Sequence, residues 1–143
     1  MKSKSILYVD SDPDFCFYVK NMIERCDERF RVTLARSAAD AIKLLKAKVF
    51  DLLLLDYCLD SGTGADVCRI SKAQDRSLPV IFYSVLGRDV DRKNAAVAGA
   101  DTYLSKPEDI GRIVPSIRQL LGIERMEPLP FHGRRPRMPS AIL

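Results

Sequence analysis

A chain of 143 residues, of which 47% are hydrophobic and 29% charged, is long enough to form one globular domain with its own core. Its net charge of +4 is too small a surplus to indicate nucleic-acid binding. The sequence has no signal peptide and no apolar run of about 18 residues, so we expect a cytoplasmic protein without a membrane span.

Apolar runs and helical periodicity alternate along the chain up to about residue 121. In chain order the pattern predicts strand 6–9, helix 13–26, strand 30–35, helix 38–45, strand 52–55, helix 65–73, strand 78–83, helix 88–98, strand 101–104 and helix 108–121. Tyr18 and Ile70 are among the helical positions expected to face inward. Five alternations with short connections predict an α/β fold with a doubly wound parallel sheet and five helices.

Local signals mark several element boundaries. Asp12 and Pro13 suit the N-cap and the first position of a helix, and Ser37 suits the N-cap of the next one. Gly99 suits the left-handed position that follows a helix. Pro115 lies inside the last predicted helix, which it should bend or delay.

The end of the chain has a different composition. Four prolines stand among arginines without periodicity, namely Pro128, Pro130, Pro136 and Pro139. We therefore expect one domain at 1–123 and a Pro/Arg-rich tail or linker at 124–143 that is either disordered or a loosely packed extension.

The cysteines and the single histidine give no zinc-binding spacing. The cysteines are Cys16, Cys26, Cys58 and Cys68. Apolar surroundings at three of them predict buried, reduced thiols and a reducing compartment.

The leucine run 52–55 predicts a central strand covered on both faces, which delivers Asp56 to the carboxyl edge of the sheet. Asp10, Ser84 and Lys106 follow three other strands and belong to the same edge. Crowded carboxylates favour a divalent cation, and Mg²⁺ is commonly held by one or two of them. A lysine and a hydroxyl suit a transferring phosphoryl group. The set predicts Asp56 as a nucleophile that accepts a phosphoryl group.

At these motifs the chain resembles the receiver domain of response regulators, over residues 5–121 or so. Four motifs carry the resemblance in the family's order and spacing: ILYVD ending at Asp10, LLD ending at Asp56 with Gly64 eight residues later, PVIFYS ending at Ser84, and GADTYLSKP ending at Pro107. The resemblance implies the flavodoxin-like strand order 2-1-3-4-5.

The resemblance also implies a role for each site residue. Asp56 would be the phospho-acceptor, with Lys106 and Ser84 contacting the phosphoryl group. Mg²⁺ would be held by Asp10, Asp56 and the main-chain carbonyl of Cys58. Tyr103 would be the switch aromatic, and the Lys106–Pro107 peptide bond would be cis.

One departure from the family pattern falls on the metal site. Ser11 stands where the family usually has a second acid that binds magnesium directly. We expect weaker Mg²⁺ binding, with Asp12 as a substitute ligand or, in preference, a helix cap. Two interpretations stay open: a domain that is still phosphorylated, or a degenerate one that binds partners without phosphorylation.

The expected function is a phospho-accepting switch of a two-component or phosphorelay system. The donor would be a histidine kinase or histidine phosphotransfer protein, because nothing in the chain suggests its own donor; His132 lies in the tail. Beyond its own phosphorylation and dephosphorylation we expect no enzyme activity. The output would pass through the fourth helix and fifth strand to a protein target, without direct binding to nucleic acid or membrane; a homodimer is a further expectation. The alternatives are a degenerate pseudo-receiver and a fragment of a longer DNA-binding or enzymatic regulator.

Overall fold

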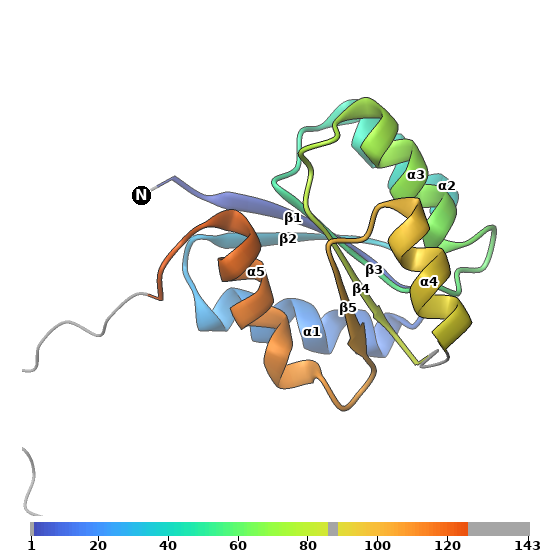
Figure 1. The fold of residues 1–143 in the computed structure, drawn as a ribbon. Coiled ribbons are helices and arrows are strands. Elements are labelled where there is room, and N and C mark those ends of the chain that lie inside the picture. The colour runs from blue at the N-terminus through green and yellow to red at the C-terminus, as the bar shows by residue number, and fades with distance from the viewer. Residues whose placement is uncertain (1, 86–88, 126–143) are drawn as a thin grey trace, which may run out of the picture.

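The computed structural model describes residues 2–85 and 89–125, which form one parallel sheet with helices on both faces (Figure 1). The strands are β1 (Lys4–Val9), β2 (Phe30–Ala35), β3 (Leu52–Leu55), β4 (Val80–Ser84) and β5 (Thr102–Ser105). They lie in the order β2-β1-β3-β4-β5, with every neighbouring pair parallel. This order confirms the predicted doubly wound, flavodoxin-like fold.

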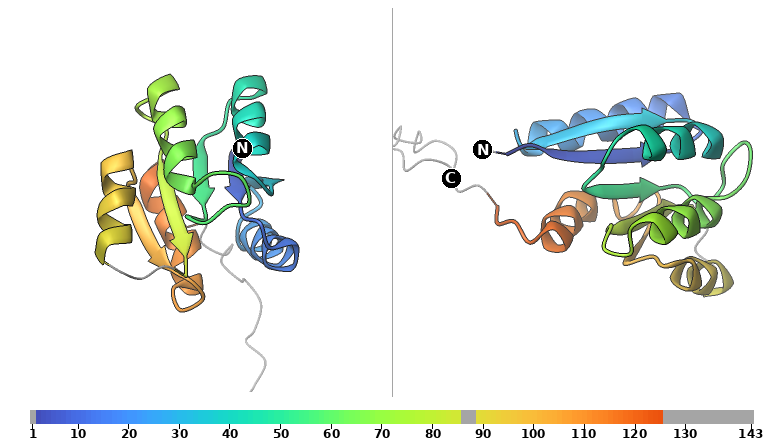
Figure 2. Two further views of the ribbon diagram at one scale, coloured as in Figure 1. Left: turned by 90° about the vertical axis from the view of Figure 1, so that its right-hand side faces the viewer. Right: turned by 90° about the horizontal axis from the view of Figure 1, so that it is seen from above.

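The helices lie in two layers, one on each face of the sheet (Figure 2). They are α1 (Pro13–Cys26), α2 (Ala38–Ala47), α3 (Gly64–Gln74), α4 (Asp89–Ala98) and α5 (Ile113–Leu121), with a 3-10 turn at Ile110–Arg112 before α5. Helices α2, α3 and α4 share one apolar cluster with the sheet, whereas α1 and α5 share the other. The sheet is therefore buried on both sides, as parallel sheets require.

The central strand β3 shows why a continuous leucine run forms here. All four leucines are fully buried, and successive side chains enter opposite clusters: Leu53 and Leu55 face α2 and α3, while Leu52 and Leu54 face α1 and α5. A strand that is covered on both faces has no exposed position for a polar residue. Asp56, the first residue after the run, is therefore placed at the carboxyl edge.

The predicted caps of the first two helices are present. The Asp12 carboxylate accepts hydrogen bonds from the main-chain N–H groups of Asp14 and Phe15, and the Ser37 hydroxyl accepts one from Asp40. These bonds satisfy amide groups that have no partner inside their own helix. The entry of the chain into α1, next to the functional edge, is therefore fixed by Asp12.

The later boundaries also have identifiable causes. Thr63 and Asp66 form a capping box, so α3 begins at Gly64, slightly earlier than predicted. Gly99 follows α4 with φ of 110°, a left-handed conformation. Pro115 lies in the first turn of α5, which begins at Ile113 rather than near residue 108, so the proline delays the helix. The Lys106–Pro107 bond is cis.

Two predicted inward positions are wrong, and so is the number of buried cysteines. Tyr18 is 60% exposed, because the buried stripe of α1 runs through Cys16, Val19 and Ile23 on the other side of the helix. Ile70 is 37% exposed, because α3 packs through the neighbouring positions. Two of the four cysteines are buried, Cys16 and Cys68; Cys26 and Cys58 are exposed.

Part of the sequence prediction lies beyond the structural description. Of the predicted tail 124–143, only Glu124 and Arg125 belong to the described residues, so His132 and the tail prolines lie outside them. The same holds for Arg88, the predicted start of the fourth helix. Among the described residues, no helix is long and apolar enough to cross a membrane.

Candidate functional site

Three charged side chains meet at the carboxyl edge of the sheet. Asp10 follows β1, Asp56 follows β3, and Lys106 follows β5. The Lys106 ammonium donates a hydrogen bond to Oδ2 of Asp10 and another, 3.1 Å long, to Oδ2 of Asp56. Asp10 is 1% and Asp56 6% exposed. The predicted residues therefore form a nearly buried acid pair bridged by one cation.

The lysine charge is stabilised where it lies. Burial alone would lower the pKa of Lys106, but the hydrogen bond to Asp10 and the negative charge of Asp56 outweigh it, so the pKa is raised. The ammonium also lies 4.4 Å from the ring centre of Phe15 and 5.9 Å from that of Tyr83, within reach of cation–π attraction. Lys106 therefore stays protonated at neutral pH.

Asp10 makes more hydrogen bonds than the sequence indicated. Besides Lys106, its Oδ2 accepts a 2.7 Å hydrogen bond from the buried Tyr8 hydroxyl, and its Oδ1 accepts one of 2.9 Å from the Asp12 N–H. Burial and the charge of Asp10 raise the pKa of Tyr8, so the phenol keeps its proton. Sequence reasoning missed Tyr8, although a tyrosine two residues before an acid on one strand shares its face and needs a partner when buried.

Asp56 has one oxygen available. Its Oδ1 is buried and has no hydrogen-bond partner among the described residues, whereas Oδ2 is held by Lys106. A buried carboxylate oxygen without a donor is costly unless a ligand completes it. The loop after Asp56 is held close by Gly64, because a Cβ added there would lie 2.1 Å from the Asp56 carbonyl oxygen. The unpartnered oxygen fits a cation or a phosphoryl group.

The other proposed metal residues lie in the two loops beside this pair. Ser11 is partly exposed, and the Asp12 carboxylate is used as the α1 cap. Cys58 pairs with Thr63 in an isolated bridge that orders the loop carrying its carbonyl. No three acids, histidines or cysteines cluster as a metal site within residues 2–85 and 89–125. Two carboxylates and a carbonyl nevertheless suit Mg²⁺, which commonly keeps several waters.

Ser84 and Tyr103 lie on the strands next to Asp56. Ser84 is fully buried at the end of β4, and its carbonyl accepts a 2.9 Å hydrogen bond from the Lys106 N–H. The partly buried Tyr103 ring stacks on Phe82 at 6.3 Å and 8°, and the Arg92 guanidinium lies 5.4 Å from its centre. The serine therefore lies at the site's edge, while the tyrosine connects β5 to α4.

A doubly wound sheet that gathers two buried aspartates and a lysine at its carboxyl edge defines a flavodoxin-like domain with a charged site at the edge where such sheets bind ligands. The family model of the response regulator receiver domain matches residues 6–118, and the chain belongs to this family. It is thus a receiver domain of two-component systems, in which phosphoryl acceptance is the general function.

Two curated relatives are similar over most of this chain. The heme response regulator HssR of Staphylococcus saprophyticus is 30% identical over 115 residues, which are 80% of this chain and 50% of that protein. The transcriptional regulatory protein CpxR of Escherichia coli is 34% identical over 116 residues, which are 81% of this chain and 48% of that protein. The chain spans about half the length of these relatives.

Solved structures give the same assignment. A two-component response regulator from Clostridium difficile has a TM-score of 0.78 at 25% identity, over 84% of this chain and 97% of that one. The receiver domain of a sensor histidine kinase from Pseudomonas aeruginosa has a TM-score of 0.75 at 25% identity, over 84% of this chain and 98% of that one. In that neighbour a magnesium ion is coordinated in the active site cleft.

Proposed function

We propose that this domain is a phospho-accepting switch that takes its phosphoryl group from a partner's phosphohistidine onto Asp56. The observation that carries the proposal is the asymmetry of the Asp56 carboxylate, with Oδ2 held by Lys106 and a buried Oδ1 that has no partner among the described residues. A nucleophile needs an oxygen that is not already used as an acceptor. Oδ1 meets that requirement.

The reaction then uses groups that are already in place. An Asp56 oxygen donates an electron pair to phosphorus, the phosphorus–nitrogen bond to the donor histidine breaks, and its electron pair returns to the imidazole nitrogen. The Lys106 ammonium, bridging Asp10 and Asp56, balances the charge carried into the site. The Ser84 hydroxyl then donates a hydrogen bond to a phosphoryl oxygen, and Tyr103 swings inward as Ser84 is drawn to the phosphoryl group.

We propose that Mg²⁺ assists with Asp10, Asp56 and the Cys58 carbonyl as protein ligands. Bound there, it would neutralise the charge that develops on the phosphoryl oxygens. The magnesium ion in the Pseudomonas aeruginosa neighbour supports such a site. Asp10 already accepts bonds from Tyr8, Asp12 and Lys106, and Ser11 brings no charge, so we expect weak binding.

A second candidate is a degenerate receiver that binds a protein partner without phosphorylation. The observation that favours it is Ser11, a neutral hydroxyl beside an acid pair that Lys106 already neutralises in part. Such a site holds no divalent cation at ordinary concentrations and leaves Asp56 unmodified. The two candidates therefore differ in one measurable quantity, the phosphorylation of Asp56.

The partners follow from the first proposal. A cytoplasmic histidine kinase or histidine phosphotransfer protein supplies the phosphoryl group, and a downstream protein binds the surface of α4 and β5, which carries the 87% exposed Val97. The domain itself catalyses nothing beyond its own phosphorylation and dephosphorylation. The chain spans about half the length of its curated relatives, which supports the alternative that it is the receiver fragment of a longer DNA-binding or enzymatic regulator.

The experiment is incubation with Mg²⁺ and acetyl phosphate, followed by intact mass measurement. We expect the parent protein and the exposed-residue control Asp60→Asn to gain one phosphoryl group, and Asp56→Asn to gain none. If the parent stays unmodified while Ser11→Asp becomes modified, the second candidate holds. If neither protein is modified at any Mg²⁺ concentration, phospho-acceptance by Asp56 is excluded for small donors, and a kinase-coupled assay repeats the comparison.

A further inference from the structure

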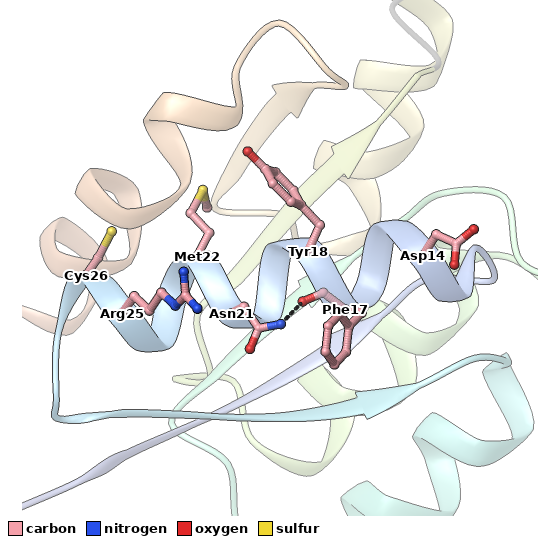
Figure 3. A pocket seen from close by; sticks show the side chains of 7 residues that line it. All are labelled: Asp14, Phe17, Tyr18, Asn21, Met22, Arg25 and Cys26. Carbon is pink, nitrogen blue, oxygen red and sulfur yellow. Dashed lines mark hydrogen bonds between the residues drawn. The ribbon is translucent and has the colours of Figure 1, made fainter.

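The outer face of α1 presents an uncovered surface with an open hollow of about 480 Å³ (Figure 3). The residues that line it come from this one helix: Asp14, Phe17, Tyr18, Asn21, Met22, Arg25 and Cys26. Phe17 is 66% and Tyr18 60% exposed, although aromatic side chains of this size normally bury most of their surface. We call these residues the α1 face.

The charges of the α1 face lie at its two ends. Asp14 lies in the first turn of the helix and Arg25 in its last, about three turns later, so both side chains leave the same side. Both are exposed, and neither makes an ion pair with another described residue. The face therefore has an acidic end, an aromatic centre and a basic end.

This arrangement is self-complementary. Asp14 and Arg25 lie equally far from the midpoint of the helix between Val19 and Lys20. Of the side chains between them, Tyr18 and Met22 lie on one flank of the helix and Phe17 and Asn21 on the other (Figure 3). If two α1 helices pack antiparallel around that midpoint, a two-fold axis brings Asp14 opposite Arg25, because a two-fold interface uses the same patch twice. On the two flanks it brings Tyr18 opposite Met22 and Phe17 opposite Asn21.

We propose that the α1 face binds the α1 face of a second copy of this chain, in an antiparallel, two-fold symmetric pair. Asp14 of each copy then meets Arg25 of the other, so the dimer gains two ion pairs at its ends. Tyr18 of each copy meets Met22 of the other, a sulfur–aromatic contact, and the two exposed Phe17 rings come to lie against Asn21 of the partner copy. The charges of the α1 face, as well as its exposed apolar side chains, therefore favour a second copy of this chain as the partner.

The proposed dimer leaves the Asp56 site out of the interface. Phe15 projects from the inner side of α1 toward Lys106, whereas the α1 face points to solvent. The inference therefore does not depend on phosphorylation and is compatible with either proposed function. A contact through one helix per protomer lies at the small end of protein interfaces, so a weak, concentration-dependent dimer is expected.

The test is sedimentation equilibrium of the full chain up to about 1 mM, a range that covers weak association. We expect reversible dimers in the parent. Asp14→Arg and Arg25→Asp should each weaken association by about tenfold or more, because each turns two attractive pairs into repulsive ones. Lys43→Asp, which reverses a charge on the exposed side of α2, should leave association unchanged.

The decisive measurement mixes the two weakened variants. In a mixed dimer every introduced charge faces an opposite one, so the mixture of Asp14→Arg with Arg25→Asp should associate more strongly than either alone. Circular dichroism confirms that both variants remain folded. A parent that stays monomeric at about 1 mM overturns the proposal. The proposal is also overturned if both charge-reversal variants dimerise as strongly as the parent, or if their mixture associates no more strongly than either variant alone. Acetyl phosphate labelling of Asp56 tests the proposed function separately.

Discussion

The Tyr8 hydroxyl donates a 2.7 Å hydrogen bond to Oδ2 of Asp10, which lies two residues further along the chain, and both side chains are buried. Tyr8→Phe removes that donor and leaves the shape of the core intact. A hydrogen bond to a buried carboxylate is worth about 1.5–3 kcal/mol, and we expect the free energy of unfolding in urea to fall by that amount.

Tyr83→Phe is the matched control for this prediction. Tyr83 is equally buried, but its hydroxyl makes only a 3.4 Å bond to the uncharged carbonyl of Pro107. Its loss should cost about 1 kcal/mol or less. If Tyr8→Phe and Tyr83→Phe lower the free energy of unfolding equally, the charged acceptor Asp10 adds no stability beyond that of a neutral one.

Lys106→Met should destabilise the domain by about 3–5 kcal/mol, because it leaves two buried carboxylates next to each other without a counter-charge. Adding Asp56→Asn to Lys106→Met removes one of those charges and should recover part of the loss. Lys72→Met is the control, since its ion pair with Asp101 is partly exposed and should contribute about 1 kcal/mol at most. Thermal unfolding of the parent, Lys106→Met, Asp56→Asn, their double variant and Lys72→Met at one pH gives the comparison. A double variant whose loss equals the sum of the two single losses would contradict the coupling.

Gly64→Ala should disrupt the loop that carries Asp56. The new Cβ would lie 2.1 Å from the Asp56 carbonyl oxygen and 3.0 Å from a carbon of the Phe82 ring, so the backbone has to move. We expect a loss of about 3 kcal/mol or more in urea unfolding, together with slower labelling of Asp56 by acetyl phosphate. Gly111→Ala meets nothing within 4 Å and should change stability by less than about 1 kcal/mol.

Asp27 should make the stability depend on acid. The hydrogen bond from the Arg29 side chain lowers the pKa of Asp27 from 3.8 to about 2, although burial acts in the opposite direction. Between these values the unfolded chain binds a proton that the folded protein does not, so this stabilisation is complete above pH 3.8 and is lost as the pH falls toward 2.

Urea unfolding at several pH values checks this dependence. In Asp27→Asn the decline between pH 4 and pH 2 should be shallower than in the parent, by the contribution of one carboxyl. Asp60→Asn removes an exposed acid instead and should keep the parent's slope. If the Asp27 variant shows the same decline as the parent, the ion pair with Arg29 does not contribute to the acid sensitivity.

The sequence predicted helix boundaries correctly where the boundary depends on one residue and its immediate neighbours. Asp12 caps α1, Ser37 caps α2, and Gly99 takes the left-handed position, because each effect depends on residues within one helical turn. Thr63 and Asp66 carried an equally readable capping-box signal, which was missed. The strand order likewise places Asp10, Asp56 and Lys106 together at the carboxyl edge of the sheet.

The sequence was less informative about which side of a helix is covered. Tyr18 and Ile70 fit a helical apolar period, yet both are exposed. Periodicity does not give the width of the helix surface that the sheet and the neighbouring helices cover. The bonds among Tyr8, Asp10 and Lys106 also join strands in three dimensions. The spacing of Tyr8 and Asp10 along β1 was a readable signal, but the bond from Lys106 depends on side-chain directions that no linear pattern encodes.

The charge that balances Asp10 and Asp56 comes from near the other end of the domain. A ribosome adds both aspartates long before it adds Lys106, so the acidic pair has no counter-charge until the fifth strand joins the sheet. The three-charge site is therefore complete only once all five strands have been synthesised.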